Sequence, residues 1–302
     1  MDRVIELNQD GVYAGLDRGF MEIRQEREAI GRVPIADIGV LLISSHGATL
    51  STPLVNEILK ANGMIVFTGE KYMPTGFVWP LGRHSREKEI LHLQIETSKP
   101  LQKRCWQKIV EMKLRFQAQV LKAATGGDEG LEELAKLVDS GDSKNLEAQG
   151  AQRYWKAMYG VEFRRRKATH QEDLYLNYGY AVLRSCVARA VAAAGLNPSL
   201  GIHHHNLENA FCLVDDLMEP FRPLVDWQVW HLSEDEEETD WGGISPEIKR
   251  TLAKVLYLDL MLEGKVSPAK TAIESLIQSF VRSLREGKVE LTFPKSILPI
   301  EE

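Results

Sequence analysis

Short runs of β-branched or alternating apolar residues fill the first eighty or so positions, and Asn, Asp and Gly separate them. This pattern is typical of β-strands. The runs are RVIEL (3–7), GVYAGL (11–16), FMEIRQ (20–25), AIGRVP (29–34), IGVLLIS (38–44) and MIVFTG (64–69). Between the last two runs we expect one helix, with Thr52 as N-cap, Pro53 at the first helical position and an end at Asn62 and Gly63. The pattern therefore predicts a small β-rich domain over residues 1–80.

From about Gly82 onward the apolar spacing becomes helical, with few strand signals. The clearest helical stretches are SREKEILHLQIETS (85–98), LQKRCWQKIVEMKLRFQAQVLKAA (101–124) and YGYAVLRSCVARAVAAAG (178–195). We expect a larger all-α domain over residues 81–302, which makes the fold class α+β with two domains. The last segment, LTFPKSILPIEE (291–302), contains two prolines and ends in acids, and we expect a loosely ordered tail.

Composition fits a globular protein with two modest domains, since 302 residues with 44% hydrophobic content can bury two cores. The chain has no run of eighteen apolar residues and no signal-peptide pattern at its start. We therefore expect a soluble cytoplasmic protein that makes no membrane contact. The three cysteines are isolated, which predicts neither a disulfide framework nor a thiolate metal site.

The formal net charge of −6 argues mildly against a general binder of polyanions. However, the segment SEDEEETD (233–240) alone contributes six acids, and such a run is most often a solvated loop. Basic residues gather in KPLQKRCWQKIVEMKLRF (99–116) and in FRRRK (163–167). These clusters can form positive stripes for phosphates, or they can simply extend from helix surfaces into water.

The stretch GIHHHNLENAFCLVDDLMEPFR (201–222) contains three histidines, two aspartates and two glutamates. In one interpretation the histidines lie in a surface loop and the acids cover the outer face of a helix. In the other, imidazole and carboxylate groups bind a divalent cation such as Mn²⁺ or Mg²⁺. Either Asp216 or Asp215 would be a helical neighbour of Glu219, and the cation would offset the repulsion between such acids. The spacing alone leaves both interpretations open.

A metal site needs a further ligand from a distant helix, and Glu147 in NLEAQGAQRYW (145–155) is the best candidate. Small residues such as Gly150 follow it and allow close helix approach. The alternative is that Glu147 is a first-turn acid that the helix dipole favours.

Three segments together resemble the CRISPR-associated integrase of spacer acquisition, the Cas-one family, in its type II branch. They are NLEAQGAQRYW, DLYLNYGYAVLRSCVARAVAAAGLNPSLGIHH and DDLMEPFRPLVD. The resemblance covers most of residues 85–230. It implies a catalytic helical domain in which Glu147, His204 and Glu219 are the catalytic residues and bind Mg²⁺ or Mn²⁺. The match of GIHH to the family's Gly-x-x-His pattern selects His204 over His203 and His205.

The resemblance also suggests roles for neighbouring residues. Asp216 matches a recurrent acid, and we expect it to orient the metal ligands. Arg222 matches the arginine of an E-x-F-R pattern, where it can bind phosphate, hold the acids in place or form an ordinary ion pair. The residues expected to contact the DNA backbone are Arg164, Arg165, Arg166, Lys167 and Arg222.

The implied reaction is transesterification, in which the 3′-hydroxyl of a captured DNA fragment attacks a phosphodiester at the leader end of a CRISPR array. The implied partners are double-stranded DNA fragments, CRISPR array DNA, a second copy of the chain bound through the β-rich domain, and a small Cas-two protein dimer. Two alternatives stay open: a metal-dependent DNA repair nuclease that uses water, and a DNA-binding scaffold without catalysis. If the acids repel one another, removing Glu219 should raise stability when metal is absent.

Overall fold

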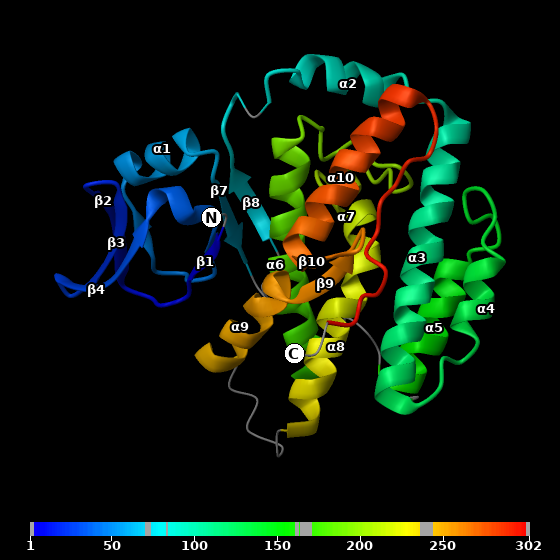
Figure 1. Cartoon of the computed structure of the whole chain (residues 1–302). Helices are drawn as coiled ribbons and strands as arrows, with labels where there is room; N and C mark the ends of the chain where they lie inside the picture. Colours follow the sequence, from blue (N-terminus) through cyan, green and yellow to red (C-terminus); the bar gives the residue numbers. More distant parts are fainter. Residues whose placement is uncertain are drawn as a thin grey trace. The chain divides into compact units, whose positions relative to one another are not determined.

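The computed structural model describes residues 3–69, 74–82, 84–160, 163, 171–235 and 244–299. The chain divides into two compact units, Met1–Ser85 and Arg86–Glu302. Figure 1 labels most of the helices and strands of both units. The expected division after residue 80 lies just before this boundary.

The N-terminal unit contains two four-stranded sheets within its described residues. The first has the order β1-β5-β7-β8, with parallel pairs up to β7 and an antiparallel last pair; its strands are β1 (Arg3–Leu7), β5 (Ile38–Ile43), β7 (Met64–Thr68) and β8 (Pro74–Val78). The second has the order β4-β3-β2-β6; its strands are β2 (Val12–Asp17), β3 (Phe20–Gln25), β4 (Glu28–Pro34) and β6 (Thr49–Leu50). The six predicted strands are confirmed, and β6 and β8 are additional.

The apolar pattern explains the core of this unit. All six residues of β5 are buried, as expected for a strand with a neighbour on each side and both faces covered. The helix α1 (Thr52–Lys60) contributes Leu54 and Ile58 to the same core. A 3₁₀ turn, η1 (Ile35–Asp37), precedes β5. The side chain of Ser51 accepts a hydrogen bond from the Leu54 amide at 3.3 Å. The N-cap is therefore Ser51 and not Thr52, because Thr52 is already helical.

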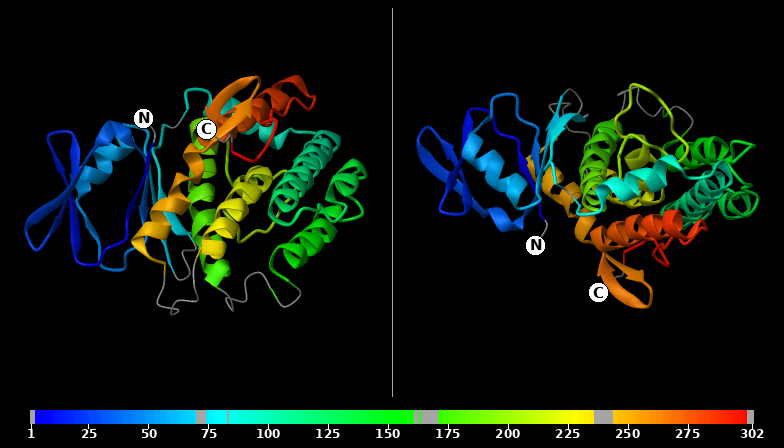
Figure 2. Two further views of the ribbon diagram at one scale, coloured as in Figure 1. Left: turned by 60° about the horizontal axis from the view of Figure 1, so that its bottom comes forward. Right: turned by 90° about the horizontal axis from the view of Figure 1, so that it is seen from above.

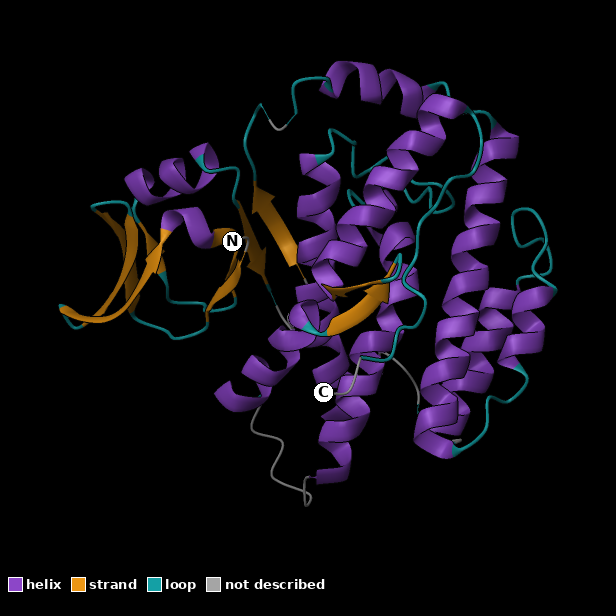
Figure 3. Cartoon of the chain, in the orientation of Figure 1, coloured by secondary structure: helices purple, strands orange, loops and turns teal. Residues whose placement is uncertain are grey.

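The second unit is mainly helical, as predicted (Figure 3). Its helices are α2 (Glu87–Ile95), α3 (Lys99–Thr125), α4 (Leu131–Lys136), α5 (Leu146–Tyr159), α6 (Gln171–Ala193), α7 (Cys212–Met218), α8 (Arg222–Asp235), α9 (Pro246–Ala253) and α10 (Ala269–Glu286), with 3₁₀ turns η3 (Glu219–Phe221) and η4 (Lys254–Tyr257). Within the described ranges, no helix is both long and apolar enough to cross a bilayer.

A two-stranded antiparallel hairpin interrupts the helices of this unit, so the all-α expectation was incomplete. It consists of β9 (Asp259–Leu262) and β10 (Lys265–Pro268). The two turn residues, Glu263 and Gly264, both have positive φ, 48° and 80°. Glu-Gly is a weaker hairpin signal than Asn-Gly or Asp-Gly, which explains why the sequence pattern did not reveal it.

The expectation of a loosely ordered tail over residues 291–302 is wrong for its described part, residues 291–299. Ile297 is fully buried. The side-chain carbonyl of Gln119 accepts hydrogen bonds from the Ser296 hydroxyl and the Ile297 amide, both at 3.0 Å. The Lys295 amide donates to the Met261 carbonyl at 2.8 Å. Residues 295–297 are therefore docked on the helical unit.

The helix α3 is 27 residues long. Its N-cap is Ser98, and it ends at Gly126, which has a φ of 86°. It packs beside α4 and α5 (Figure 2). At Gly150 of α5, a Cβ atom would lie only 2.1 Å from a methyl group of Leu114. The predicted close helix approach is thus real, and it brings the start of α5 against α3.

Candidate active site

Glu147, His204 and Glu219 line one cavity of about 230 Å³ in the helical unit. They come from α5, from the loop before α7 and from η3. The other lining residues are Lys113, Gln117, Ala151, Trp155, Tyr180, Arg222 and Asp226. The fold therefore brings together three residues that lie up to 72 positions apart (147 to 219).

Glu147 lies in the first turn of α5, as the sequence suggested. The N-cap residue is Asn145, but its side chain caps no amide, and the Asp142 carboxylate takes that role. The Asp142 carboxylate accepts from the Leu146 amide at 2.8 Å and from the Glu147 amide at 3.0 Å. This cap satisfies amides at the start of the helix and fixes the backbone that carries Glu147.

The three consecutive histidines have three different environments. The ring of His203 stacks on buried Trp106, with centroids 4.3 Å apart and an interplanar angle of 3°. The Nδ1 atom of His204 lies 2.5 Å from Oδ1 of Asp216. His205 lines a separate cavity. Of the three, only His204 lines the cavity that Glu147 and Glu219 also line.

Asp216 organises the histidine loop from inside the protein. Its carboxylate is fully buried and accepts from the amides of Ile202 at 2.6 Å, His203 at 2.9 Å and His204 at 3.3 Å. The loop curls so tightly here that a Cβ atom at Gly201 would lie 2.2 Å from the His204 carbonyl oxygen. This geometry fits the predicted orienting role: Asp216 occupies Nδ1 of His204 and leaves Nε2 as the nitrogen suited to ligation.

Asp215, the neighbouring acid, belongs to a different contact. Its carboxylate accepts from Nε of Arg184 at 2.7 Å, from Nη2 of Arg184 at 2.8 Å and from the side-chain Nδ2 of Asn209 at 2.8 Å. The alternative pairing of Asp215 with Glu219 on one helix face is therefore not formed, because Asp215 is directed toward α6.

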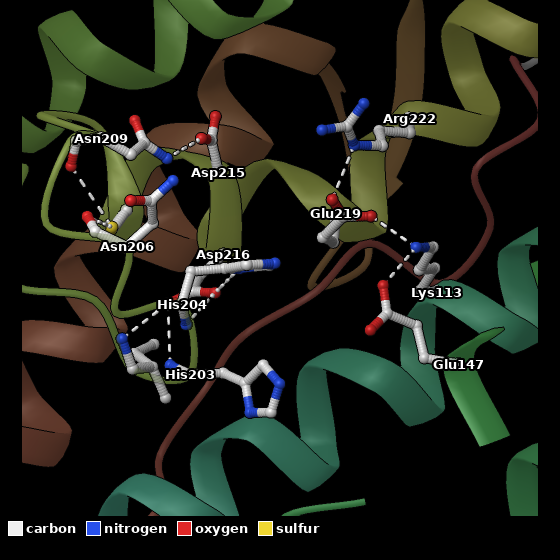
Figure 4. Close-up of polar contacts among 12 residues, drawn as sticks. Lys113, Glu147, His203, His204, Asn206, Asn209, Asp215, Asp216, Glu219 and Arg222 are labelled. Carbon is white, nitrogen blue, oxygen red and sulfur yellow. Dashed lines mark hydrogen bonds and ion pairs between the residues drawn. The ribbon is translucent and has the colours of Figure 1, made fainter. Parts of the chain in front are cut away.

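Lys113 of α3 lies between the two glutamates, and the sequence analysis missed it. Its Nζ atom is 2.7 Å from Oε1 of Glu147 and 2.6 Å from Oε2 of Glu219 (Figure 4). Arg222 binds the other oxygen of Glu219, with Nε to Oε1 at 2.8 Å. The expected repulsion between unbalanced acids is therefore wrong for this arrangement, because two cations balance Glu219.

A sequence signal for Lys113 does exist. Buried residues of α3 recur every four positions, and the series Cys105, Ile109, Lys113 and Gln117 places two polar residues on the buried face of the helix. Within a stretch rich in Lys and Arg, this one lysine is distinguished only by that spacing.

The charges around the cavity support one another. Burial opposes ionisation of Glu219, but Arg222 and Lys113 outweigh it and hold the pKa of this carboxyl well below its ordinary value. Burial likewise opposes the charge of Lys113, but Glu219 and Glu147 raise its pKa. The hydrogen bond to Asp216 raises the pKa of His204 above 6.5. Glu219 and Lys113 are therefore both charged at neutral pH.

The donor types at the cavity fit a divalent ion: two carboxylates and one imidazole with Nδ1 already held by Asp216. With Lys113 between the glutamates, no three Cys, His, Asp or Glu side chains in the described ranges are close enough together to hold one ion. The metal role of Glu147, His204 and Glu219 stays a prediction.

The residues predicted to bind DNA are only partly placed. The guanidinium of Arg222 lies over the ring of Tyr180, 4.8 Å from its centroid, and lines the cavity. The basic run, Arg164, Arg165, Arg166 and Lys167, lies outside the described residues. Contact of these residues with DNA stays a prediction.

Two solved structures share the fold of this chain. A casposase bound to its integration product has a TM-score of 0.82 at 19% identity, with 99% of this chain and 96% of that chain covered. A chain of a Cas6-RT-Cas1–Cas2 complex has a TM-score of 0.77 at 15% identity, with 100% of this chain and 36% of that chain covered. Both matches include the small β-rich unit and the helical unit.

Sequence comparison gives the family. A protein of Neisseria meningitidis serogroup C (strain 8013), named CRISPR-associated endonuclease Cas1, is 34% identical over 299 residues, which cover 98% of this chain and 97% of that protein. The sequence model of the family described as CRISPR associated protein Cas1 matches residues 5–241. The chain therefore belongs to the CRISPR-associated Cas1 family, the Cas-one family that its motifs indicated.

Proposed function

We propose that this protein is a metal-dependent DNA integrase of CRISPR adaptation, which joins the 3′-hydroxyl ends of captured DNA fragments to the CRISPR array. Family membership supports the proposal, as does the name of the Neisseria relative, a CRISPR-associated endonuclease. The casposase neighbour, whose structure contains an integration product, shares the fold over nearly the whole chain.

The observation that carries the proposal is the meeting of Glu147, His204 and Glu219 at one cavity, with Asp216 behind the histidine. These three residues would hold Mg²⁺ or Mn²⁺. When bound, such an ion aligns a hydroxyl nucleophile and stabilises the charge that develops on a phosphodiester in the transition state.

The remaining residues of the cavity set its geometry and charge. Asp216 fixes the plane of the His204 ring and directs Nδ1 inward. Arg222 holds Glu219 by one oxygen and presents its guanidinium to the cavity, where it is positioned to bind a phosphate oxygen. In the reaction one phosphorus–oxygen bond forms to the 3′-oxygen as another breaks, so no external energy source is needed. The protein has mainly to position the two DNA ends.

The DNA must be held largely through its phosphates, because captured fragments differ in sequence. We assign this role to Arg222 and to the basic run Arg164, Arg165, Arg166 and Lys167. The proposed assembly is a homodimer formed through the β-rich unit, together with the small Cas-two protein dimer. The Cas6-RT-Cas1–Cas2 neighbour is consistent with such a partner. Placement in the type II branch stays a prediction.

An integration assay tests the proposal. Labelled double-stranded fragments are incubated with a plasmid that carries a CRISPR array, with Mn²⁺ or Mg²⁺ or with a chelator, and with or without the partner dimer. We expect joined products only with metal, and none from Glu147→Gln or His204→Ala. A mobility shift without joined or cleaved products in any metal would indicate the alternative function, a DNA-binding scaffold.

The name of the Neisseria relative favours a second activity at the same site, hydrolysis of DNA. Water would replace the 3′-hydroxyl, and the same three residues would serve. Branched DNA labelled on one strand separates the two activities, because strand joining lengthens the labelled strand and hydrolysis shortens it. Loss of both activities in Glu147→Gln is the expected result if they share one site.

A further inference from the structure

The ammonium group of Lys113 occupies the space between the two glutamates of the cavity (Figure 4). It contacts Oε1 of Glu147 at 2.7 Å and Oε2 of Glu219 at 2.6 Å. Lys113 is only 7% exposed, so these carboxylates replace much of the water that would otherwise solvate the charge. Because Arg222 already binds Oε1 of Glu219, Lys113 uses the remaining oxygen of that residue.

Lys113 therefore uses one oxygen of each glutamate that would otherwise be available to a metal ion, and together with Arg222 it occupies both oxygens of Glu219. A divalent cation and an ammonium group at the same two oxygens would repel each other strongly, and more so in a buried site than in water. Binding of an ion by both glutamates thus requires the ammonium to move. A lysine can do this, because its charge lies at the end of a flexible four-carbon stem.

Gln117 offers the displaced ammonium a second position. It follows Lys113 by four residues on α3, so the two side chains project from the same helix face. It lines the same cavity and is only 3% exposed. Its Oε1 atom has no hydrogen-bond partner within the described part of the chain. A buried carbonyl oxygen without a donor carries a free-energy cost, which a hydrogen bond from Lys113 would remove.

We propose that Lys113 is an exchangeable counter-cation: it holds Glu147 and Glu219 together before metal binds, and yields their oxygens to the ion by moving to Gln117. This inference rests on the proposed metal role of the two glutamates. It makes Lys113 a positioning residue that opposes metal binding at equilibrium and stabilises the metal-free site.

The variant Lys113→Met tests the exchange, because it keeps the unbranched stem and removes the charge. Mn²⁺ alone, without DNA, is titrated into the full-length protein by calorimetry, and melting is followed in a chelator. We expect Mn²⁺ to bind about tenfold tighter or more, while the metal-free melting temperature falls by several degrees. The matched control is Lys108→Met, which removes a lysine of the same helix whose ion pair with Glu111, at 3.0 Å, is partly exposed and outside the cavity. Neither quantity should change there.

The variant Gln117→Leu tests the second position. Its expected effects on Mn²⁺ affinity and on the metal-free melting temperature differ in direction from those of Lys113→Met. Without the amide oxygen the displaced ammonium lacks an acceptor, so Mn²⁺ should bind several-fold more weakly. The metal-free protein should melt at the same temperature or higher, because a buried unpaired carbonyl has been removed. Wild-type affinity in Gln117→Leu would overturn the movement to Gln117. This variant also keeps the proposal testable if Lys113→Met fails to fold.

The variant Glu147→Gln separates this inference from the proposed function. If it abolishes Mn²⁺ binding and Lys113→Met binds no tighter than wild type, the exchange is wrong and the metal site stands. If neither wild type nor Lys113→Met binds Mn²⁺ at a site that depends on Glu147, both the proposed metal site and the exchange are overturned. Tighter binding by Lys113→Met that Glu147→Gln abolishes supports both.

Discussion

Oδ1 of Asp216 lies 2.5 Å from Nδ1 of His204, and the same carboxylate also accepts hydrogen bonds from three consecutive backbone amides, Ile202 to His204. One buried acid thus fixes both the path of the histidine loop and the orientation of the ring. This arrangement makes Asp216 as consequential for the site as the residues that face the cavity.

Replacing this acid should therefore damage both folding and metal binding. In Asp216→Asn the amide group must face backbone donors, so the free energy of unfolding should fall by about 2–4 kcal/mol. Loss of the orienting contact should weaken Mn²⁺ binding by about 10- to 100-fold. Urea denaturation and Mn²⁺ titration measure the two effects.

The control is Asp215→Asn on the same helix, which disturbs the ion pair with Arg184. It should reduce stability but leave Mn²⁺ affinity near that of the wild type. Wild-type Mn²⁺ affinity in Asp216→Asn would refute the orienting role.

The histidine triplet should give three different phenotypes. His204→Ala should abolish strand transfer and leave folding and DNA binding largely intact. His203→Ala removes the stack on Trp106 and should cost about 1 kcal/mol of stability with transfer retained. His205→Ala should have the smallest effect on transfer. Strand-transfer gels, mobility shifts and denaturation distinguish these outcomes. An inactive His205→Ala beside an active His204→Ala would show that the register is wrong.

Mn²⁺ binding should depend on pH through His204. Asp216 raises the pKa of this ring above 6.5, and a protonated ring cannot bind metal. As the solution is acidified, the affinity for Mn²⁺ should therefore begin to fall while the pH is still above 6.5. At lower pH it should decrease roughly tenfold per pH unit. Calorimetry down to about pH 5.5 measures this slope, within the range in which imidazole titrates. An affinity independent of pH over this range would exclude His204 as a ligand.

The stability of the metal-free protein should also depend on pH through His204, but acidification should raise this stability whereas it lowers Mn²⁺ affinity. Because the folded-state pKa is raised, the charged ring stabilises the fold fully below 6.5, and this contribution is lost as pH rises through the folded-state value. Urea denaturation in a chelator, compared between wild type and His204→Gln, should show a smaller pH dependence in the variant.

Removal of Glu219 should lower stability, contrary to the expectation from sequence. The carboxylate balances two buried cations, and Glu219→Gln would leave Lys113 and Arg222 with one partner fewer. Breaking such a buried network costs about 3 kcal/mol or more. Denaturation in a chelator measures the loss.

A half-buried acid of α3 outside the cavity, Glu111, provides the comparison. Glu111→Gln breaks ion pairs with the more exposed Lys108 and Arg115 and should cost less than Glu219→Gln, about 1 kcal/mol. A Glu219→Gln variant more stable than wild type would restore the repulsion hypothesis.

The sequence by itself determined the local elements and the identity of the acids and imidazole at the site. Apolar alternation located six strands, and helical spacing located the long helices, because these patterns depend on which face each residue must bury. Spacing alone left two interpretations of these acids and histidines open, and the resemblance to a family singled out Glu147, His204 and Glu219, which line one cavity. The choice among His203, His204 and His205 needed a family pattern, because three consecutive histidines give no spacing that distinguishes one from another.

Tertiary structure alone decided what balances those acids. Lys113 lies 34 residues before Glu147 and 106 before Glu219, and only the packing of α5 against α3 at Gly150 brings its charge between them. Docking of residues 295–297 was equally hidden, because its hydrogen bonds reach Gln119 and Met261, far away in the chain. Local sequence records which residues a segment buries, whereas long-range ion pairs and docked ends depend on which segments the fold places side by side.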